Sequence, residues 1–158
     1  MDLAELLGTV VEIYRSRPSP GPRPTFRLDV SPSVDYAVLG APGRLGQVVD
    51  NLVSNAISFS PPGGTVRLAL GRREGVVEIR VEDDGPGVPE AAERLFERFY
   101  TRRPEGEAFG RHSGLGLSIA RQIVEASGGS ILAENRRSQD GRVLGARFIV
   151  RLPAAGFD

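Results

Sequence analysis

Residues 42–59, PGRLGQVVDNLVSNAISF, constrain the fold of this chain more than any other stretch. Proline is favoured in the first turn of a helix, and the SPPGG sequence that follows residue 59 ends one. Between these signals, apolar residues recur at helical spacing and form one broad face: Leu45, Val48, Val49, Leu52, Val53, Ala56 and Ile57. A helix with so wide an apolar face has to be covered by the rest of the chain.

A polar stripe runs along this predicted helix. Gln47, Asn51, Asn55 and Ser58 follow at intervals of four, four and three residues, which places them on one line. Asparagine is a mediocre helix former and is costly to bury without hydrogen-bond partners. Either a solvated helix face or a polar ligand explains the stripe, and the stripe alone does not decide between them.

The remainder of the chain alternates helical and strand patterns. Strand patterns lie at residues 25–30, 65–70, 76–83, 130–135 and 146–152, with a hairpin turn at 71–75 and a further short strand at 35–40. Helical patterns lie at residues 91–103 and 114–129. A length of 158 residues suits one domain. We therefore predict an α/β fold, an α+β two-layer sandwich with a mixed, mostly antiparallel sheet and helices packed on one face.

The N-terminal segment also reads as a helix. Its apolar residues share one face and are Leu3, Leu6, Leu7, Val10, Val11 and Tyr14. That face packs either on its own domain or on a partner segment outside this sequence. Prolines at 18, 20, 22 and 24 make residues 17–25 an extended connector.

Composition excludes several classes of function. The 20 acidic residues balance the 20 basic ones, so we expect no nucleic-acid partner and no contact of this piece with a membrane. All 20 basic residues are arginine. The planar guanidinium group of arginine can bind a phosphate through two N–H groups at once, whereas the ammonium group of lysine acts as a point charge. Without cysteine there is no disulfide and no cysteine metal site. No apolar run is long enough to cross a bilayer, so we expect a soluble piece.

Three features carry the chemistry: the asparagines of the polar stripe, DDGPG at residues 83–87, and SGLGLS at residues 113–118. Each has a structural explanation on its own, namely a solvated helix face, a turn that ends a strand, and tight helix packing. Their joint appearance in this order is a much stronger signal than any one of them alone.

These motifs resemble a known family. NLVSNA, DDGPGV, FERFY and SGLGLSIARQIVEASGG look like the N, G1, F and G2 boxes of the ATP-binding catalytic domain of bacterial sensor histidine kinases, which shares the Bergerat fold with gyrase, Hsp90 and MutL. NAISFSPPGG further resembles the ChvG-type sensor kinases of alphaproteobacteria. The resemblance implies a catalytic domain over residues 26–158, an ATP lid at about 101–113, and residues 1–16 as a linker helix from a dimerisation domain outside this sequence.

The resemblance also implies the site residues. Asn55 would be the Mg²⁺ ligand, with Asn51 as a second, direct or water-mediated, ligand, and these two amides are the candidate catalytic residues. Asp83 would accept the exocyclic amine of adenine, while Gly85 and Gly87 let the backbone approach the purine. The remaining nucleotide-binding candidates are Ser58, Phe59, Val88, Arg98, Phe99, Tyr100, Ser113, Gly114, Leu115, Gly116 and Leu117.

This sequence departs from the family pattern at several positions. Ser58 stands where a basic residue commonly reaches the phosphates, and Phe59 stands where tyrosine is frequent. Arg98 and the arginines of the lid are therefore candidates for the missing positive charge. Relatives that hydrolyse ATP carry a glutamate base at the position of Asn51, and an amide cannot take a proton from water.

We therefore expect a domain that binds Mg²⁺–ATP and donates the γ-phosphate to a histidine on a separate dimerisation domain, with a response-regulator receiver domain downstream. The only histidine, His112, falls in the lid and is read as an exposed lid residue. We expect a cytoplasmic domain of an inner-membrane sensor kinase. The alternatives are an anti-sigma-type serine kinase or nucleotide-binding regulatory module, and a Bergerat-fold ATPase.

Overall fold

The computed structural model describes residues 1–18, 21–98 and 116–156. Within these ranges the elements follow in the order α1 (Leu3–Ser16), β1 (Thr25–Asp29), α2 (Pro42–Phe59), β2 (Thr65–Arg73), β3 (Val76–Glu82), the 3-10 helix η1 (Ala92–Phe96), α3 (Gly116–Ala126), β4 (Ser130–Arg137) and β5 (Val143–Pro153).

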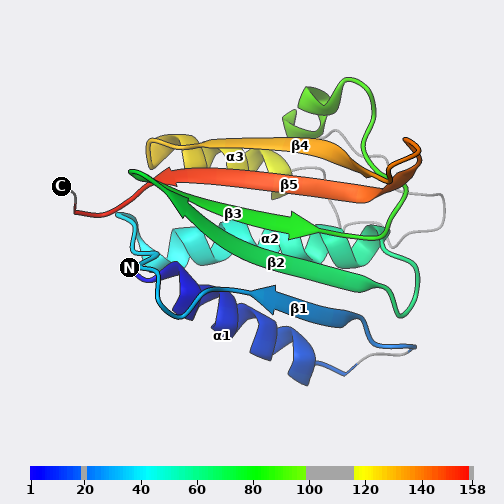
Figure 1. The fold of residues 1–158 in the computed structure, drawn as a ribbon, viewed down its shortest axis with the longest axis horizontal. Helices are drawn as coiled ribbons and strands as arrows, with labels where there is room; N and C mark the ends of the chain where they lie inside the picture. The colour runs from blue at the N-terminus through cyan, green and yellow to red at the C-terminus, as the bar shows by residue number, and fades with distance from the viewer. Residues whose placement is uncertain (19–20, 99–115, 157–158) are drawn as a thin grey trace.

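Five strands of the described residues form one sheet in the order β1-β2-β3-β5-β4. Strand β1 runs parallel to β2, while the other three pairs are antiparallel. Figure 1 shows helices α1, α2 and α3 on one side of this sheet, and none of the described helices covers its other side, which we call the open face. The predicted two-layer sandwich with a mixed, mostly antiparallel sheet is confirmed.

The core lies between the sheet and the helices. Alternate residues of β2 and β3, such as Leu68 and Ile79, are fully buried beneath the helices, as a sheet with one covered face requires. Helix α2 begins at Pro42 and ends at Phe59, the predicted bounds, and Leu52 and Val53 on its apolar face are inaccessible to solvent. The predicted broad apolar face of this helix is therefore the main partner of the sheet.

Helix α1 packs on its own domain. Leu3, Leu7 and Val11 are buried in the same core as α2 and the sheet. The Tyr14 hydroxyl donates a hydrogen bond to Asp50 Oδ1 at 2.6 Å, which ties the end of α1 to the middle of α2. The first of the two alternatives for this helix is thus the observed one.

Two predicted elements differ in kind. The helical pattern at residues 91–103 gives only η1, Ala92–Phe96, and the part of it beyond residue 98 lies outside the described residues. Residues 35–40 do not form a strand. They make single bridges, Asp2 with Ala37 and Val38 with Ala154, and no continuous ladder forms because the two neighbouring residues pair with different parts of the chain.

Among the described residues, no helix is long and apolar enough to cross a membrane.

The topology brings together the end of β3, the end of α2 and the start of α3. Strand β3 stops at Glu82 and leads into the DDGPG turn, which packs against the last residue of α2, since a Cβ on Gly85 would lie 2.6 Å from the Phe59 carbonyl oxygen. Helix α3 starts beside α2 at Gly116. The sequence-predicted site residues come from these three ends.

Candidate nucleotide site

Asp83 is the most constrained side chain of the site. It is 2% exposed, and its Oδ1 accepts hydrogen bonds from the backbone N–H groups of Gly85 at 2.8 Å and Ala146 at 3.1 Å. Both bonds fall on one carboxylate oxygen, which leaves Oδ2 for another donor. Burial raises the pKa of Asp83 above its usual value, and the two N–H groups and the charge of Arg136 act against that rise.

Side chains from four parts of the chain line a small cavity beside Asp83. Helix α2 supplies Asn55 and Phe59, and the turn after β3 supplies Gly87 and Val88, so four predicted nucleotide-binding residues meet Asp83 here. Apolar residues from η1 and β5 complete the wall: Leu95, Ala146 and Phe148. The cavity thus combines apolar walls with a carboxylate and an amide, the usual make-up of a small-molecule site.

The glycines of the turn are explained by close packing. Gly87 has φ +92°, a conformation that other residues rarely adopt, and a Cβ there would collide with Asn135 and Val143. The side chain of Asn135 also bonds to both backbone groups of Val88, the residue after Gly87. Its Oδ1 accepts from Val88 N–H at 2.7 Å, and its Nδ2 donates to the Val88 carbonyl at 3.3 Å. The shape of the turn is therefore set by strand β4 as well as by β3.

A second close approach involves strand β5. A Cβ on Gly145 would overlap the backbone carbonyl of Asp83, so only glycine lets β5 come near enough for Ala146 to bond to the carboxylate. Neither Gly145 nor Asn135 was predicted from the sequence to take part in the site. A glycine inside a strand is a local signal that another backbone approaches closely, but it does not identify that partner. Asn135 gives no such signal, because the residue that it binds lies far away in the sequence.

The two asparagines of the polar stripe have different surroundings. Asn55 is 7% exposed and lines the cavity. Asn51 is half-buried, and its Nδ2 donates to the Gly116 carbonyl at 2.9 Å, which joins α2 to the first turn of α3. The amide oxygen of Asn51 takes no part in that bond.

The donor set fits Mg²⁺. This ion takes oxygen ligands, keeps several waters, and is usually held by one or two protein groups together with substrate phosphates. Asn55 is buried, lines the cavity and carries an amide oxygen, which is the kind of ligand that Mg²⁺ takes. Among the described residues, no group of three or more His, Cys, Asp or Glu side chains is placed to hold a metal by itself.

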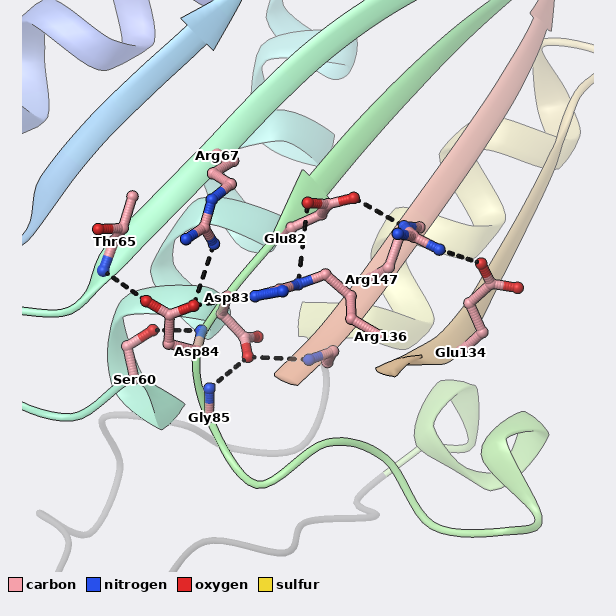
Figure 2. A network of polar contacts seen from close by, with 11 residues as sticks. Ser60, Thr65, Arg67, Glu82, Asp83, Asp84, Gly85, Glu134, Arg136 and Arg147 are labelled. Carbon is pink, nitrogen blue, oxygen red and sulfur yellow. Dashed lines mark hydrogen bonds and ion pairs between the residues drawn. The ribbon is translucent and has the colours of Figure 1, made fainter. Parts of the chain in front are cut away.

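Asp84 faces the opposite side of the sheet from Asp83. Figure 2 shows its carboxylate held by Thr65 N–H at 3.1 Å, Arg67 at 3.0 Å and Arg136 at 2.9 Å. Its own N–H donates to Ser60 Oγ at 3.3 Å. Partial burial raises the pKa of Asp84, but these donors outweigh burial and leave the pKa below its usual value.

The ion pairs of Asp84 continue across the open face. Arg136 also lies 3.8 Å from Glu82, and Arg147 bridges Glu82 at 2.7 Å to Glu134 at 2.8 Å (Figure 2). From the sequence, a role was predicted only for the first aspartate of DDGPG, and this role of the second aspartate was missed. The doubled aspartate was the one signal available, since strand alternation sends neighbours to opposite faces.

Other predicted site residues lie at the edge of the described structure. Leu117 is half-buried against the core, Gly116 begins α3, and Ser58 is half-buried on α2. Arg98 is exposed at the end of the segment that follows η1. The remaining candidates, and the lid at 101–113 with His112, lie outside the described residues: Phe99, Tyr100, Ser113, Gly114 and Leu115.

Comparison with known proteins gives one consistent result. Residues 40–156 match the family described as "Histidine kinase-, DNA gyrase B-, and HSP90-like ATPase". The chain is 48% identical over 162 residues to the sensor protein ChvG of Rhizobium meliloti (strain 1021), a match that covers 98% of this chain and 28% of that protein. It is 39% identical over 155 residues to the histidine-protein kinase/phosphatase MprB of Mycobacterium sp. (strain KMS), with 97% and 28% covered.

Solved structures agree. The mycobacterial sensor histidine kinase MprB superposes with a TM-score of 0.81 at 30% identity, covering 99% of this chain and 97% of that one. The histidine kinase ThkA, solved in complex with the response regulator TrrA, gives a TM-score of 0.78 at 28% identity, covering 98% and 41%. The chain spans about a quarter of the length of the curated relatives it matches.

Proposed function

Because this chain belongs to the family of histidine kinase-, DNA gyrase B- and HSP90-like ATPases, we propose that it binds Mg²⁺–ATP and donates the γ-phosphate to a histidine on a separate dimerisation domain of a sensor kinase. The ATP-binding domain of sensor histidine kinases is the class that the comparisons support. The reaction, the magnesium ion and the roles of individual residues are our inference.

The hydrogen bonding of Asp83 carries the proposal. Its Oδ1 is occupied by the N–H groups of Gly85 and Ala146, so Oδ2 is the oxygen left to accept the exocyclic amine of adenine. Guanine offers no donor at that position. A charged hydrogen bond lost from a buried site costs about 1.5–3 kcal/mol, so the site should select ATP over GTP by about ten- to a hundredfold.

Asn55 is the proposed protein ligand of Mg²⁺. A neutral amide oxygen leaves the positive charge of the ion free to neutralise the phosphates. Asn51 supports this arrangement from one helical turn away, because its bond to the Gly116 carbonyl holds the start of α3 beside α2. The start of α3 is where backbone N–H groups would meet phosphate oxygens.

Transfer to a protein histidine suits these residues better than hydrolysis. Asn51 cannot act as a general base, so the domain would protect ATP from water until an acceptor arrives in line with the γ-phosphate. Phosphoryl transfer of this kind depends mainly on positioning and charge neutralisation.

We further propose how the domain sits in its parent protein. Residues 1–16 would join a preceding dimerisation domain, and a response-regulator receiver domain would take the phosphate next. The solved complex of ThkA with the response regulator TrrA supports a partner of that class. The domain would lie on the cytoplasmic side of the inner membrane.

The test combines binding with transfer. Calorimetry should show that the parent prefers ATP to GTP and that Asp83→Asn loses at least tenfold in ATP affinity. Mixing with a histidine-bearing dimerisation domain and labelled ATP should give acid-labile phosphate on that domain. Asn55→Ala should abolish the transfer, while Arg151→Gln on the open face should leave it unchanged.

Each alternative function has its own result in this test. Phosphate that is acid-stable and lies on a partner serine would identify a serine kinase. Rapid release of free phosphate without any acceptor would identify an ATPase. ATP affinity within twofold of the parent in Asp83→Asn would remove the adenine assignment.

A further inference from the structure

We propose that Arg136 is a positioning residue for the adenine-binding carboxylate, acting through Asp84 from the open face of the sheet. The inference depends on the proposed function, because it assigns the support behind Asp83 rather than a new ligand. Arg136 does not line the cavity, and its distance of 52 residues from Asp84 hides the link in the sequence.

Asp84 is the anchor of the turn. Its carboxylate accepts from a backbone N–H of β2 and from arginines of two different strands, Arg67 on β2 and Arg136 on β4. Asp83 is the next residue along the backbone and points to the other face. A fixed Asp84 therefore fixes the backbone from which the Asp83 carboxylate projects.

Arg136 is the more buried of the two arginines. Its side chain is 12% exposed, against 36% for Arg67, so its charge is screened less by water. Its Nη2 lies 2.9 Å from Asp84 Oδ1, while its buried Nε has no hydrogen-bond partner within the described residues and lies 3.8 Å from Glu82. Replacing a buried ion pair by apolar groups is frequently neutral for stability, so stability alone gives a weak reason for an arginine here.

The charge of Arg136 gives a better reason. Burial raises the pKa of Asp83, and among the arginines the charge of Arg136 is the one that lowers it again. Asp84, next to Asp83, acts in the opposite direction. The other wall residues of the cavity are neutral. Arg136 pairs with Glu82 of β3 and with Asp84 of the turn that follows it. Arg67 of β2 also pairs with Asp84, and Arg147 of β5 pairs with Glu82 and with Glu134 of β4.

The experiment measures ATP affinity by calorimetry at pH 8 and pH 6 for the parent, Arg136→Gln, Arg136→Lys and the control Arg151→Gln. Arg151 pairs with Glu78 on the same open face but away from Asp84. We expect Arg136→Gln to weaken ATP binding by about three- to tenfold at pH 8 and by more at pH 6, because the Asp83 carboxylate would be protonated more readily. Arg136→Lys should keep the parental ratio between the two pH values and lose part of the affinity.

A double-mutant cycle separates positioning from general destabilisation. In an Asp83→Asn background there is no carboxylate to hold or ionise, so adding Arg136→Gln should change ATP affinity less than twofold. An equal loss in both backgrounds, or a pH ratio in Arg136→Gln equal to that of Arg151→Gln, would overturn the inference. If Arg136→Gln does not fold, parental affinity in Arg136→Lys at both pH values would overturn it as well.

Failure of the proposed function gives a different result. In that case the parent itself would not discriminate ATP from GTP, or Asp83→Asn would bind ATP as well as the parent does. Loss of affinity in Asp83→Asn together with parental behaviour of Arg136→Gln would refute the role of Arg136 alone.

Discussion

At the scale of single residues, the site is held from both faces of one turn. Asp83 points into the cavity and Asp84 points away from it, and strand β4 supplies a partner for each side. Asn135 grips the backbone of Val88, and Arg136 grips Asp84. Two consecutive β4 residues thus fix the turn that carries the adenine-binding candidate.

Asp83 should reduce the stability of the empty domain. Its raised pKa means that the folded state binds the proton more tightly than the unfolded state, so the ionised carboxylate costs stability at neutral pH. Asparagine keeps the oxygen that accepts from Gly85 and Ala146 and carries no charge. Asp83→Asn should therefore raise the Tm of the nucleotide-free domain by about 1–4 °C at pH 7–8.

The difference in thermal stability between Asp83→Asn and the parent should depend on pH. The advantage of Asp83→Asn should shrink as pH falls through the raised pKa and vanish below the unfolded value of 3.8. Thermal melts followed by circular dichroism from pH 8 to pH 4 measure it. A variant less stable than the parent at pH 8 would show that the carboxylate stabilises the empty fold.

The sequence pointed to Asp83, Asn55 and Phe59, because each lies in a motif whose residues are close together in the chain. It did not point to Asn135 or Arg136, which lie 47 and 52 residues beyond their partners Val88 and Asp84. Their roles depend on the register of β4 on β5 and of β5 on β3, and no local pattern encodes those registers.

At the scale of elements, periodicity predicted the helices and strands well. Helix α2 has the predicted bounds because its proline start and its SPPGG end are strong local signals. The pattern at 91–103 was less reliable, since its described part is a single short 3-10 helix. The segment at 35–40 has strand-like residues but leaves Leu39 exposed and makes only isolated bridges. Whether such a segment forms a strand depends on the segments available to pair with it, and a local sequence pattern carries no information about those partners.

The contact between α1 and α2 offers a test at this scale. Burial of the Tyr14 hydroxyl is the largest cause, and the hydrogen bond to Asp50 the second, of a rise in the pKa of Tyr14 to about 12. Tyr14→Phe removes the bond and leaves Asp50 without its hydroxyl partner, so we expect a loss of about 1–2 kcal/mol in the free energy of unfolding at pH 7.

The pH dependence of this loss follows from the raised pKa. The stability that Tyr14 contributes is fully present below the unfolded value of 10.0 and is lost as pH rises through about 12. Urea titrations at pH 7, 10 and 11.5 should therefore show the gap between parent and Tyr14→Phe closing at the alkaline end. A gap that stays constant would mean that the hydroxyl is not bonded as described.

At the scale of the whole molecule, binding of Mg²⁺–ATP should raise the free energy of unfolding of the entire domain. The site takes residues from α2, from the turn after β3, and from η1 and β5, and α2, η1 and β5 also contribute to the core. Binding to the folded state alone stabilises it by mass action. At a free Mg²⁺–ATP concentration of about 100 times Kd the gain is about 2.7 kcal/mol, or roughly 5–10 °C in Tm for a domain of this size.

Differential scanning fluorimetry with ATP, GTP and ATP plus EDTA measures this shift. We expect a large shift with Mg²⁺–ATP, a smaller one when EDTA removes the metal, and little with GTP. Equal shifts with ATP and GTP would contradict the selection by Asp83, and equal shifts with and without EDTA would contradict a metal on Asn55.

Strand order has a consequence for how the protein is made. Strand β5 follows β4 in the chain yet lies between β3 and β4 in the sheet. During synthesis, the β2–β3 hairpin leaves the ribosome well before residue 146. The Asp83 carboxylate therefore lacks one of its two backbone donors, the N–H of Ala146, until β5 has been made. The cavity beside Asp83 is therefore complete only when β5 has taken its place between β3 and β4, because Ala146 and Phe148 of β5 form part of its wall. We expect a nascent chain that stops before β5 to carry all four motifs and yet fail to bind nucleotide.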